Sequence, residues 1–286
     1  MNKNTRGLLS IHFAVLLFGL SGLFGKWISL SPLLIVLGRT FFAFLALGLV
    51  LAFQGRPLKV RSLKDLFGFV GLGGVLALHW GSFFQSIQSS TVALGLLTYS
   101  TFPLFVTFME PRLFHERLRP FDVGTAAVVF FGLILVLPSF DFGSHITQGA
   151  LWGVLSGFTF AVLSLLNRYY VRSYSSSVIA FYQNLFAALM IFPFFLPKPL
   201  HVTGKDIFSL FLLGVPCTAL AHVLFIKGLG RVRAQIAGVA ASLEPVYGIL
   251  LALLLLGETP SARTIIGGSM IIGAAVTTAL KPKNSS

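Results

Sequence analysis

Long apolar runs, separated only by short polar joints, dominate this sequence. A helix rises about 1.5 Å per residue, so about 20 apolar residues cross a bilayer core about 30 Å thick. Ten runs approach or exceed this length: Leu8–Trp27, Leu33–Phe53, Leu66–Phe84, Val92–Met109, Phe121–Leu137, Ala150–Val171, Val178–Leu196, Ile207–Ile226, Ile236–Leu256 and Thr264–Leu280. Because the runs are continuous rather than alternating, they favour helices over the strands of a barrel. The sequence therefore predicts an all-α polytopic membrane protein with ten transmembrane helices.

Composition also favours a membrane protein over a soluble one. Hydrophobic residues make up 56% of the 286 residues and charged residues only 10%, whereas soluble domains contain about a quarter charged residues. On a soluble chain the net charge of +13 would suggest nucleic-acid binding. Here the basic residues lie between the apolar runs, so we expect a lipid bilayer and no nucleic acid as the partner.

The distribution of Lys and Arg predicts the topology. With the N-terminus in the cytoplasm, sixteen of the 21 Lys and Arg residues fall on the cytoplasmic side and four on the other, and Arg39 lies within a run. Cytoplasmic loops are enriched in Lys and Arg, and a miscounted run would scramble this separation. We therefore expect a multi-pass protein of the cell (inner) membrane with both termini in the cytoplasm.

The two halves of the chain match each other at an offset of 142 residues. The offset pairs Gly7 with Gly149, Lys26 with Arg168, Ala77 with Ala219, Pro103 with Pro245 and Glu116 with Glu258. Five spans per half are an odd number, so the second half enters the membrane from the opposite side. Inverted repeats of this kind occur in many secondary transporters. We predict two five-helix repeats, residues 1–140 and 141–286.

Two motifs related by this offset carry a family resemblance. Ser242–Pro245 leads through Leu254–Glu258, and Thr101–Pro103 leads through Phe114–Glu116. With these motifs the whole chain resembles the drug/metabolite transporter superfamily, specifically its EamA-type ten-helix exporters. The resemblance implies a monomeric bundle with a central cavity lined mainly by helices 1, 3, 4, 6, 8 and 9, and it is closest to bacterial amino-acid and metabolite exporters. The first half departs from the motif, because Phe102 stands where a Glu precedes the Pro.

Three helical stripes combine aromatic rings with a few polar groups. The third run places Leu76, His79, Trp80 and Phe83 on one face, the fourth Gly95, Thr98, Tyr99 and Phe102, and the sixth Ser156, Thr159, Phe160 and Ser164. This spacing is that of one helix face, and apolar pockets with a few polar groups are typical small-molecule sites. The alternative is ordinary helix packing. We predict that the substrate-binding residues are His79, Trp80, Phe83, Thr98, Tyr99, Phe160, Ser164, His222 and Ser242.

Four residues within the runs are candidates for other roles. Pro103 and Pro245 remove a backbone donor in mid-span, which fits hinges or gates, with static kinks as the alternative. Glu244 lies deep in the ninth run, where a carboxylate either couples transport to protons or is structural. Arg39 either attracts a substrate carboxylate, or snorkels to the interface or pairs with a neighbour.

The sequence lacks the motifs that would indicate an ATP-driven pump, a membrane enzyme or a metal site. We find no Walker A sequence, no paired catalytic constellation and no third ligand spaced to complete a metal site with His79 and His222. We therefore expect no enzyme, no catalytic residues, no cofactor and no metal. The sequence predicts a secondary transporter that exports amino acids or related small metabolites by alternating access, as a monomer. An exporter of lipophilic drugs or cations, or a membrane channel without a transport cycle, remains the alternative.

Overall fold

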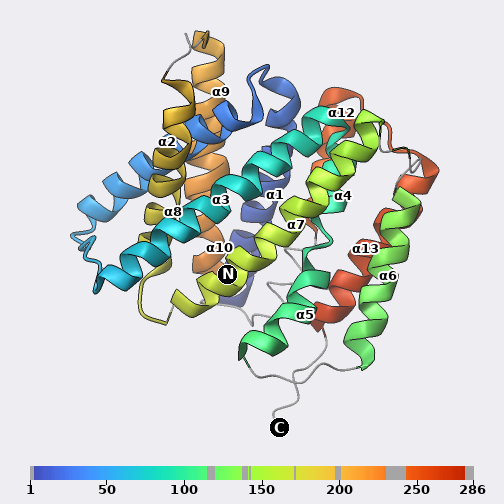
Figure 1. The fold of residues 1–286 in the computed structure, drawn as a ribbon, viewed down its shortest axis with the longest axis horizontal. Coiled ribbons are helices and arrows are strands. Elements are labelled where there is room, and N and C mark those ends of the chain that lie inside the picture. Colours follow the sequence, from blue (N-terminus) through green and yellow to red (C-terminus); the bar gives the residue numbers. More distant parts are fainter. Residues whose placement is uncertain are drawn as a thin grey trace.

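A computed structural model describes residues 3–114, 120–136, 141, 143–170, 172–196, 201–229 and 243–280. All regular elements in these residues are helical (Figure 1). The helices are α1 Lys3–Trp27, α2 Pro32–Phe53, α3 Leu63–Ser89, α4 Val92–Tyr99, α5 Phe102–Phe114, α6 Pro120–Val136, α7 His145–Tyr170, α8 Ser176–Ile191, the 3₁₀ segment η1 Phe192–Phe195, α9 Gly204–Gly214, the π-helical segment η2 Val215–Leu220, α10 Ala221–Leu229, α12 Glu244–Leu256 and α13 Ala262–Leu280.

The helices have the length and apolarity of membrane spans. Among the residues that the structure describes, six continuous helical stretches are long and apolar enough to cross a bilayer: Thr5–Trp27, Pro32–Phe53, Leu63–Ser89, His145–Asn167, Ser176–Phe195 and Gly204–Phe225. Shorter apolar helices cover Val92–Val106, Val123–Val136, Glu244–Leu256 and Ala262–Ala274. Large apolar side chains such as Phe53 and Leu254 are exposed on the outer faces, as lipid requires. The predicted all-α membrane fold is confirmed, and the count of ten spans stays a prediction.

Local sequence signals explain where several helices begin. The Ser62 side chain accepts a hydrogen bond from Asp65 N at 3.1 Å, and Thr91 accepts one from Leu94 N at 3.1 Å. These bonds satisfy donors that the first turn of a helix leaves free. Thr203 and Asp206 form a reciprocal capping box at the start of α9. Pro32 begins α2, where its missing N–H costs nothing.

The packing of the helices is symmetric between the two halves. α1 packs against α10 and α12, just as α7 packs against α3 and against α4 with α5. α6 pairs with α13 at one side of the bundle and α2 pairs with α8 at the other (Figure 1). Exchanging the first five predicted spans for the last five reproduces this pattern of contacts. The packing is therefore that expected of a duplicated chain, although the boundary between residues 140 and 141 stays a prediction.

Glycines let the central helices approach closely. A Cβ atom added at Gly149 would lie 2.8 Å from Ser90 Cβ, and one at Gly157 would lie 2.8 Å from the Tyr99 carbonyl oxygen. A Cβ at Gly153 would collide with Thr98 Oγ1. On the other side of the bundle, a Cβ at Gly19 would lie 2.8 Å from Gly248 N. These contacts bring α7 against α3 and α4, and α1 against α12, as small residues do in membrane bundles.

Candidate functional site

Three of the predicted site residues meet at the centre of the bundle. The ring centroid of His79 on α3 lies 5.6 Å from that of Tyr99 on α4 and 5.1 Å from that of Phe160 on α7. The rings of Tyr99 and Phe160 are 5.3 Å apart in an edge-on arrangement. The Nδ1 atom of His79 lies 3.0 Å from both the carbonyl and the hydroxyl oxygen of Ser156. The three stripes that the sequence singled out therefore face one another.

Two further rings complete this cluster. Phe83 lies 5.7 Å from Tyr99, and Phe102 lies 5.7 Å from Tyr99 and 5.0 Å from Phe160, measured between ring centroids. His79, Phe83 and Tyr99 are buried, so in this conformation the rings are shielded from the surroundings. Aromatic faces with a few polar tips are suited to holding a small organic molecule. We call His79, Phe83, Tyr99, Phe102 and Phe160 the ring cluster.

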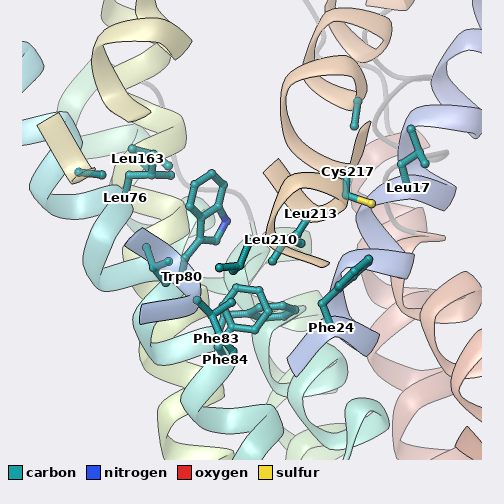
Figure 2. Packing of buried hydrophobic residues seen from close by; sticks show 14 of the residues in the cluster. Leu17, Phe24, Leu76, Trp80, Phe83, Phe84, Leu163, Leu210, Leu213 and Cys217 are labelled. Atoms are coloured by element: carbon teal, nitrogen blue, oxygen red, sulfur yellow. The ribbon is translucent and has the colours of Figure 1, made fainter. Parts of the chain in front are cut away.

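Arg39 lies against the ring of Trp80, next to this cluster. The Arg39 side chain is only 3% exposed, and its Cζ atom lies 3.7 Å from the Trp80 ring centroid. This is a cation–π contact. Figure 2 shows Trp80 pointing from α3 toward Leu210 and Leu213 of α9. Of the two expectations, that Arg39 attracts a substrate carboxylate or that it snorkels or pairs with a neighbour, the structure shows the pairing, because the buried side chain contacts Trp80 and does not reach the interface. Attraction of a substrate carboxylate stays a prediction.

The π-helical segment provides the second partner of Arg39. Arg39 Nε donates a hydrogen bond to Thr218 Oγ1 at 2.8 Å, and Thr218 Oγ1 donates in turn to the Leu213 carbonyl at 2.7 Å. Thr218 lies within η2, which contains Pro216, and π-helical turns are frequent at functional sites. Sequence reasoning did not single out Thr218. The available signal was Pro216, a proline in the middle of the eighth run.

The charge of Arg39 acts on residues from both halves of the chain. Arg39 interacts electrostatically with Tyr99 and Glu244, and with His79 and His222. These four residues come from α3, α4, α10 and α12. Arg39 therefore lies where predicted site residues from both halves of the chain come together.

Other predicted site residues lie apart from the ring cluster. Thr98 is fully buried, its hydroxyl donates to the Leu94 carbonyl at 2.7 Å, and it packs on Gly153. His222 Nδ1 donates a hydrogen bond to the Thr218 carbonyl oxygen, 2.9 Å away, and the His222 ring lies 5.4 Å from that of Phe18. Ser164 is partly buried on α7, one turn beyond Phe160. Ser242 lies outside the described residues.

Both predicted hinge prolines lie where a helix begins. The fourth run is broken at Ser100 and Thr101, and Pro103 is the second residue of α5. Pro245 is likewise the second residue of α12, with Glu244 in the first turn. The fourth run is therefore divided into two helices, α4 and α5, next to Pro103. A role in gating stays a prediction.

Glu258, which follows α12, links the end of that helix to the start of α4. Its Oε2 atom accepts a hydrogen bond from Val92 N, the first residue of α4, at 2.9 Å. Beside it, Lys26 Nζ donates to the Ser90 carbonyl at 2.5 Å. The motif residue Glu258 therefore caps a helix of the other half of the chain. Its predicted counterpart, Glu116, lies outside the described residues.

Comparison with known proteins agrees with this architecture. A model of the EamA-like transporter family matches residues 5–137 and again residues 147–280. A solved crystal structure of a protein superposes with a TM-score of 0.67 over 98% of this chain and 97% of its own, at 20% sequence identity. That likeness shows the fold.

Several curated relatives are similar over most of their length. An uncharacterized transporter of Archaeoglobus fulgidus is 28% identical over 267 residues, covering 93% of each chain. The uncharacterized inner membrane transporter YicL of Salmonella typhimurium is 24% identical and covers 96% of each. An S-adenosylmethionine uptake transporter of Rickettsia felis is 26% identical over 75% of this chain and 69% of its own. On the two matches of the family model, the chain belongs to the EamA-like transporter family and is a membrane transporter.

Proposed function

We propose that this transporter exports amino acids or related small metabolites across the cell (inner) membrane by alternating access. It acts as a monomer with both termini in the cytoplasm. The ring cluster receives the side chain of the substrate, and the two halves move about Pro103 and Pro245, each the second residue of its helix. In such a cycle the substrate site lies between the two repeats and opens alternately to each side of the membrane.

The meeting of His79, Tyr99 and Phe160 is the observation that supports this proposal. These three residues come from three different helices, and their ring centroids are 5.1–5.6 Å apart. His79 and Ser156 add polar atoms to an otherwise aromatic site. This chemistry is suited to a small molecule with one polar head and an apolar or aromatic body.

A measurement of efflux tests this assignment directly. Proteoliposomes containing the purified protein are loaded with an equimolar mixture of the twenty common L-amino acids, and their release is followed by mass spectrometry. We expect a subset rich in apolar and aromatic amino acids to leave faster than from empty liposomes. Equal release from both preparations for all twenty compounds contradicts amino-acid transport.

S-adenosylmethionine is the second candidate, because one relative is an uptake transporter for this compound. It is added to the same mixture and measured in both directions. A lipophilic cation such as tetraphenylphosphonium, included in a parallel preparation, tests the alternative of drug export. If S-adenosylmethionine or the lipophilic cation moves faster than every amino acid, that compound replaces the amino acids as the proposed substrate class.

Counterflow separates a carrier from a channel. A carrier that alternates between two states accelerates uptake of labelled substrate when unlabelled substrate is present on the other side. A pore shows no such acceleration. We expect at least severalfold trans-stimulation, and its absence at saturating internal substrate supports a channel.

Glu244 is our candidate for coupling to protons, with a structural role as the alternative. It is the carboxylate of the first turn of α12, and a carboxylate inside a span is a functional candidate by default. We expect Glu244→Gln to flatten the dependence of uptake on pH. An unchanged pH profile assigns Glu244 to structure or to substrate binding alone.

A further inference from the structure

We propose that Arg39 binds the carboxylate of the transported amino acid. This inference rests on the proposed amino-acid transport, and it names the part of the substrate that the site recognises. The site would select a substrate by its carboxylate, whereas the ring cluster would receive the side chain.

Arg39 has a donor that the described structure does not use. Its Nη1 atom is buried and has no hydrogen-bond partner among the described residues. A buried charged donor without a partner costs more free energy than a neutral one, and Arg inside a span is rare unless it is paired or functional. A carboxylate suits this donor, because its two oxygens match the fork of a guanidinium group.

Two neighbours hold the guanidinium group in place. Thr218 Oγ1 accepts from Nε at 2.8 Å, and the Trp80 ring covers one face at 3.7 Å. Trp80 is buried, so this support is held by packing. Nη1 is left for an incoming group while the plane of the guanidinium is already fixed. Such preorganisation lowers the entropy lost when a ligand binds.

An α-amino acid carries its carboxylate on the carbon that also bears the side chain, so one molecule meets both Arg39 and the rings beside it. S-adenosylmethionine, the compound named for one relative, carries the same carboxylate.

The ring cluster lies beside Arg39. The Arg39 Cζ atom lies 3.7 Å from the Trp80 ring centroid, and that centroid lies 6.3 Å from the ring centroid of His79, a member of the cluster. A molecule bound head-first at Arg39 therefore has aromatic faces next to it for its side chain. This placement explains why one site combines a buried cation with apolar rings.

Matched analogues test the inference on the unaltered protein. L-phenylalanine is compared with 2-phenylethylamine, which lacks the carboxylate, and with 3-phenylpropionate, which lacks the amine. L-leucine is compared with isoamylamine and 4-methylpentanoate in the same way. We expect each amine to inhibit amino-acid efflux at least about tenfold more weakly than its parent and than the acid that keeps the carboxylate, since hydrogen bonds to charged groups contribute this much or more.

Variants test Arg39 itself. We expect Arg39→Gln to reduce amino-acid efflux at least about tenfold and Arg39→Lys to restore part of it, because Lys keeps the charge without the fork. Arg56→Gln is the matched control, since Arg56 is exposed in the joint between α2 and α3 and loses the same charge. Tryptophan fluorescence during thermal unfolding checks that each variant is folded.

The outcomes separate the inference from the proposed function. If no amino acid leaves the liposomes, amino-acid transport fails and the inference fails with it. If amino acids leave but the amines inhibit as strongly as their parents, only the inference is overturned. A folded Arg39→Gln variant with unchanged efflux overturns it as well. If that variant does not fold, the analogue panel on the unaltered protein decides.

Discussion

The guanidinium carbon of Arg39 lies 3.7 Å from the centroid of the Trp80 ring, and this contact joins α2 to α3 inside the bundle. The same arginine reaches Thr218 in η2, 179 positions along the chain. Trp80 therefore holds in place a charged side chain that contacts both halves of the chain. A desolvated cation–π contact contributes about 2 kcal/mol, so the ring is important for the position of Arg39 as well as for packing.

We expect Trp80→Ala and Tyr99→Ala to raise the KM for transport or abolish flux while leaving membrane insertion intact. Trp80→Phe should retain more activity than Trp80→Ala, because a phenyl ring still covers the guanidinium group. Initial rates of efflux over a range of substrate concentrations measure the effect. Trp27→Ala is the control, because Trp27 is partly exposed at the end of α1. Unchanged kinetics for both Trp80→Ala and Tyr99→Ala would contradict the assignment of the site.

The sequence predicted the ring cluster because helical spacing and residue type agree there. His79 on α3 and Phe160 on α7 both fall on stripes of period 3.6, and such stripes must be buried against another helix. The duplication adds which helices correspond between the halves. It does not say which residue of a stripe faces which neighbour. Thr98 illustrates this limit: it shares a stripe with Tyr99, but its hydroxyl bonds its own helix and packs on Gly153.

The position of Arg39 was beyond prediction for a physical reason. A long side chain six residues inside a span can reach either the interface or the interior, and only packing decides between them. Here the deciding contacts are Trp80, from the next helix, and Thr218, from the other half of the chain. The π-helical turn that presents Thr218 depends on Pro216 and its surroundings, which local spacing does not reveal.

We expect Gly153→Ala to destabilise the protein by about 1–3 kcal/mol, the usual cost of overpacking. The added methyl group would collide with Thr98 Oγ1. Gly124→Ala is the control, because Gly124 lies in α6 and nothing lies within 4 Å of its added Cβ. This control should be neutral or stabilising, since Ala favours helix over Gly. Thermal unfolding in detergent measures both.

A double variant separates collision from other effects of Gly153→Ala. Adding Thr98→Ala removes Oγ1, the nearest atom to the new methyl group, but leaves the Cβ of residue 98 and Ser86 Oγ close to it. Only part of the lost stability should therefore return. If the losses of stability from the two substitutions simply add, the collision between α7 and α4 is not the cause of the destabilisation by Gly153→Ala.

We expect Glu258→Ala to lower the free energy of unfolding by about 1 kcal/mol, the usual contribution of a side chain that caps a helix. Its carboxylate accepts the N–H of Val92, which the first turn of α4 leaves otherwise unpaired. Glu258→Gln should lose less, because the amide oxygen still accepts. Thr259→Ala, at an exposed neighbouring position, serves as the control. Equal stability of all three variants argues that the cap contributes nothing.

The joint between α7 and α8 is held to the start of α3 by Tyr174. Its hydroxyl donates to Asp65 Oδ2 at 2.8 Å and accepts from Arg61 N at 2.8 Å. We expect Tyr174→Phe to cost about 1–2 kcal/mol, since each bond contributes about 1 kcal/mol. Tyr169→Phe is the control, because Tyr169 is 57% exposed. Chemical unfolding of the two variants gives the comparison.

We expect the contribution of Tyr174 to the free energy of unfolding to decrease only as the pH rises. Burial raises the pKa of the Tyr174 phenol above its usual value of 10.0, and the hydrogen bond to Asp65 raises it further. The folded state therefore favours the neutral phenol. The stability from this group is fully present below about pH 10 and is lost as the pH rises through the higher pKa of the folded state. A difference in the free energy of unfolding between the unaltered protein and Tyr174→Phe that persists well above that pKa would contradict this expectation.

Pro103 should control the rate of transport more than the affinity for substrate. Proline at position 103 has no N–H to donate to the Tyr99 carbonyl four residues earlier, and α4 ends at Tyr99 while α5 begins at Phe102. In Pro103→Ala the restored donor favours one continuous helix. We expect kcat for efflux to fall severalfold with little change in KM, because stiffening a hinge slows the exchange between states. Pro57→Ala, in the exposed joint after α2, should leave both constants unchanged. If Pro103→Ala also leaves kcat unchanged and remains folded, the break in the fourth run is a static feature of packing.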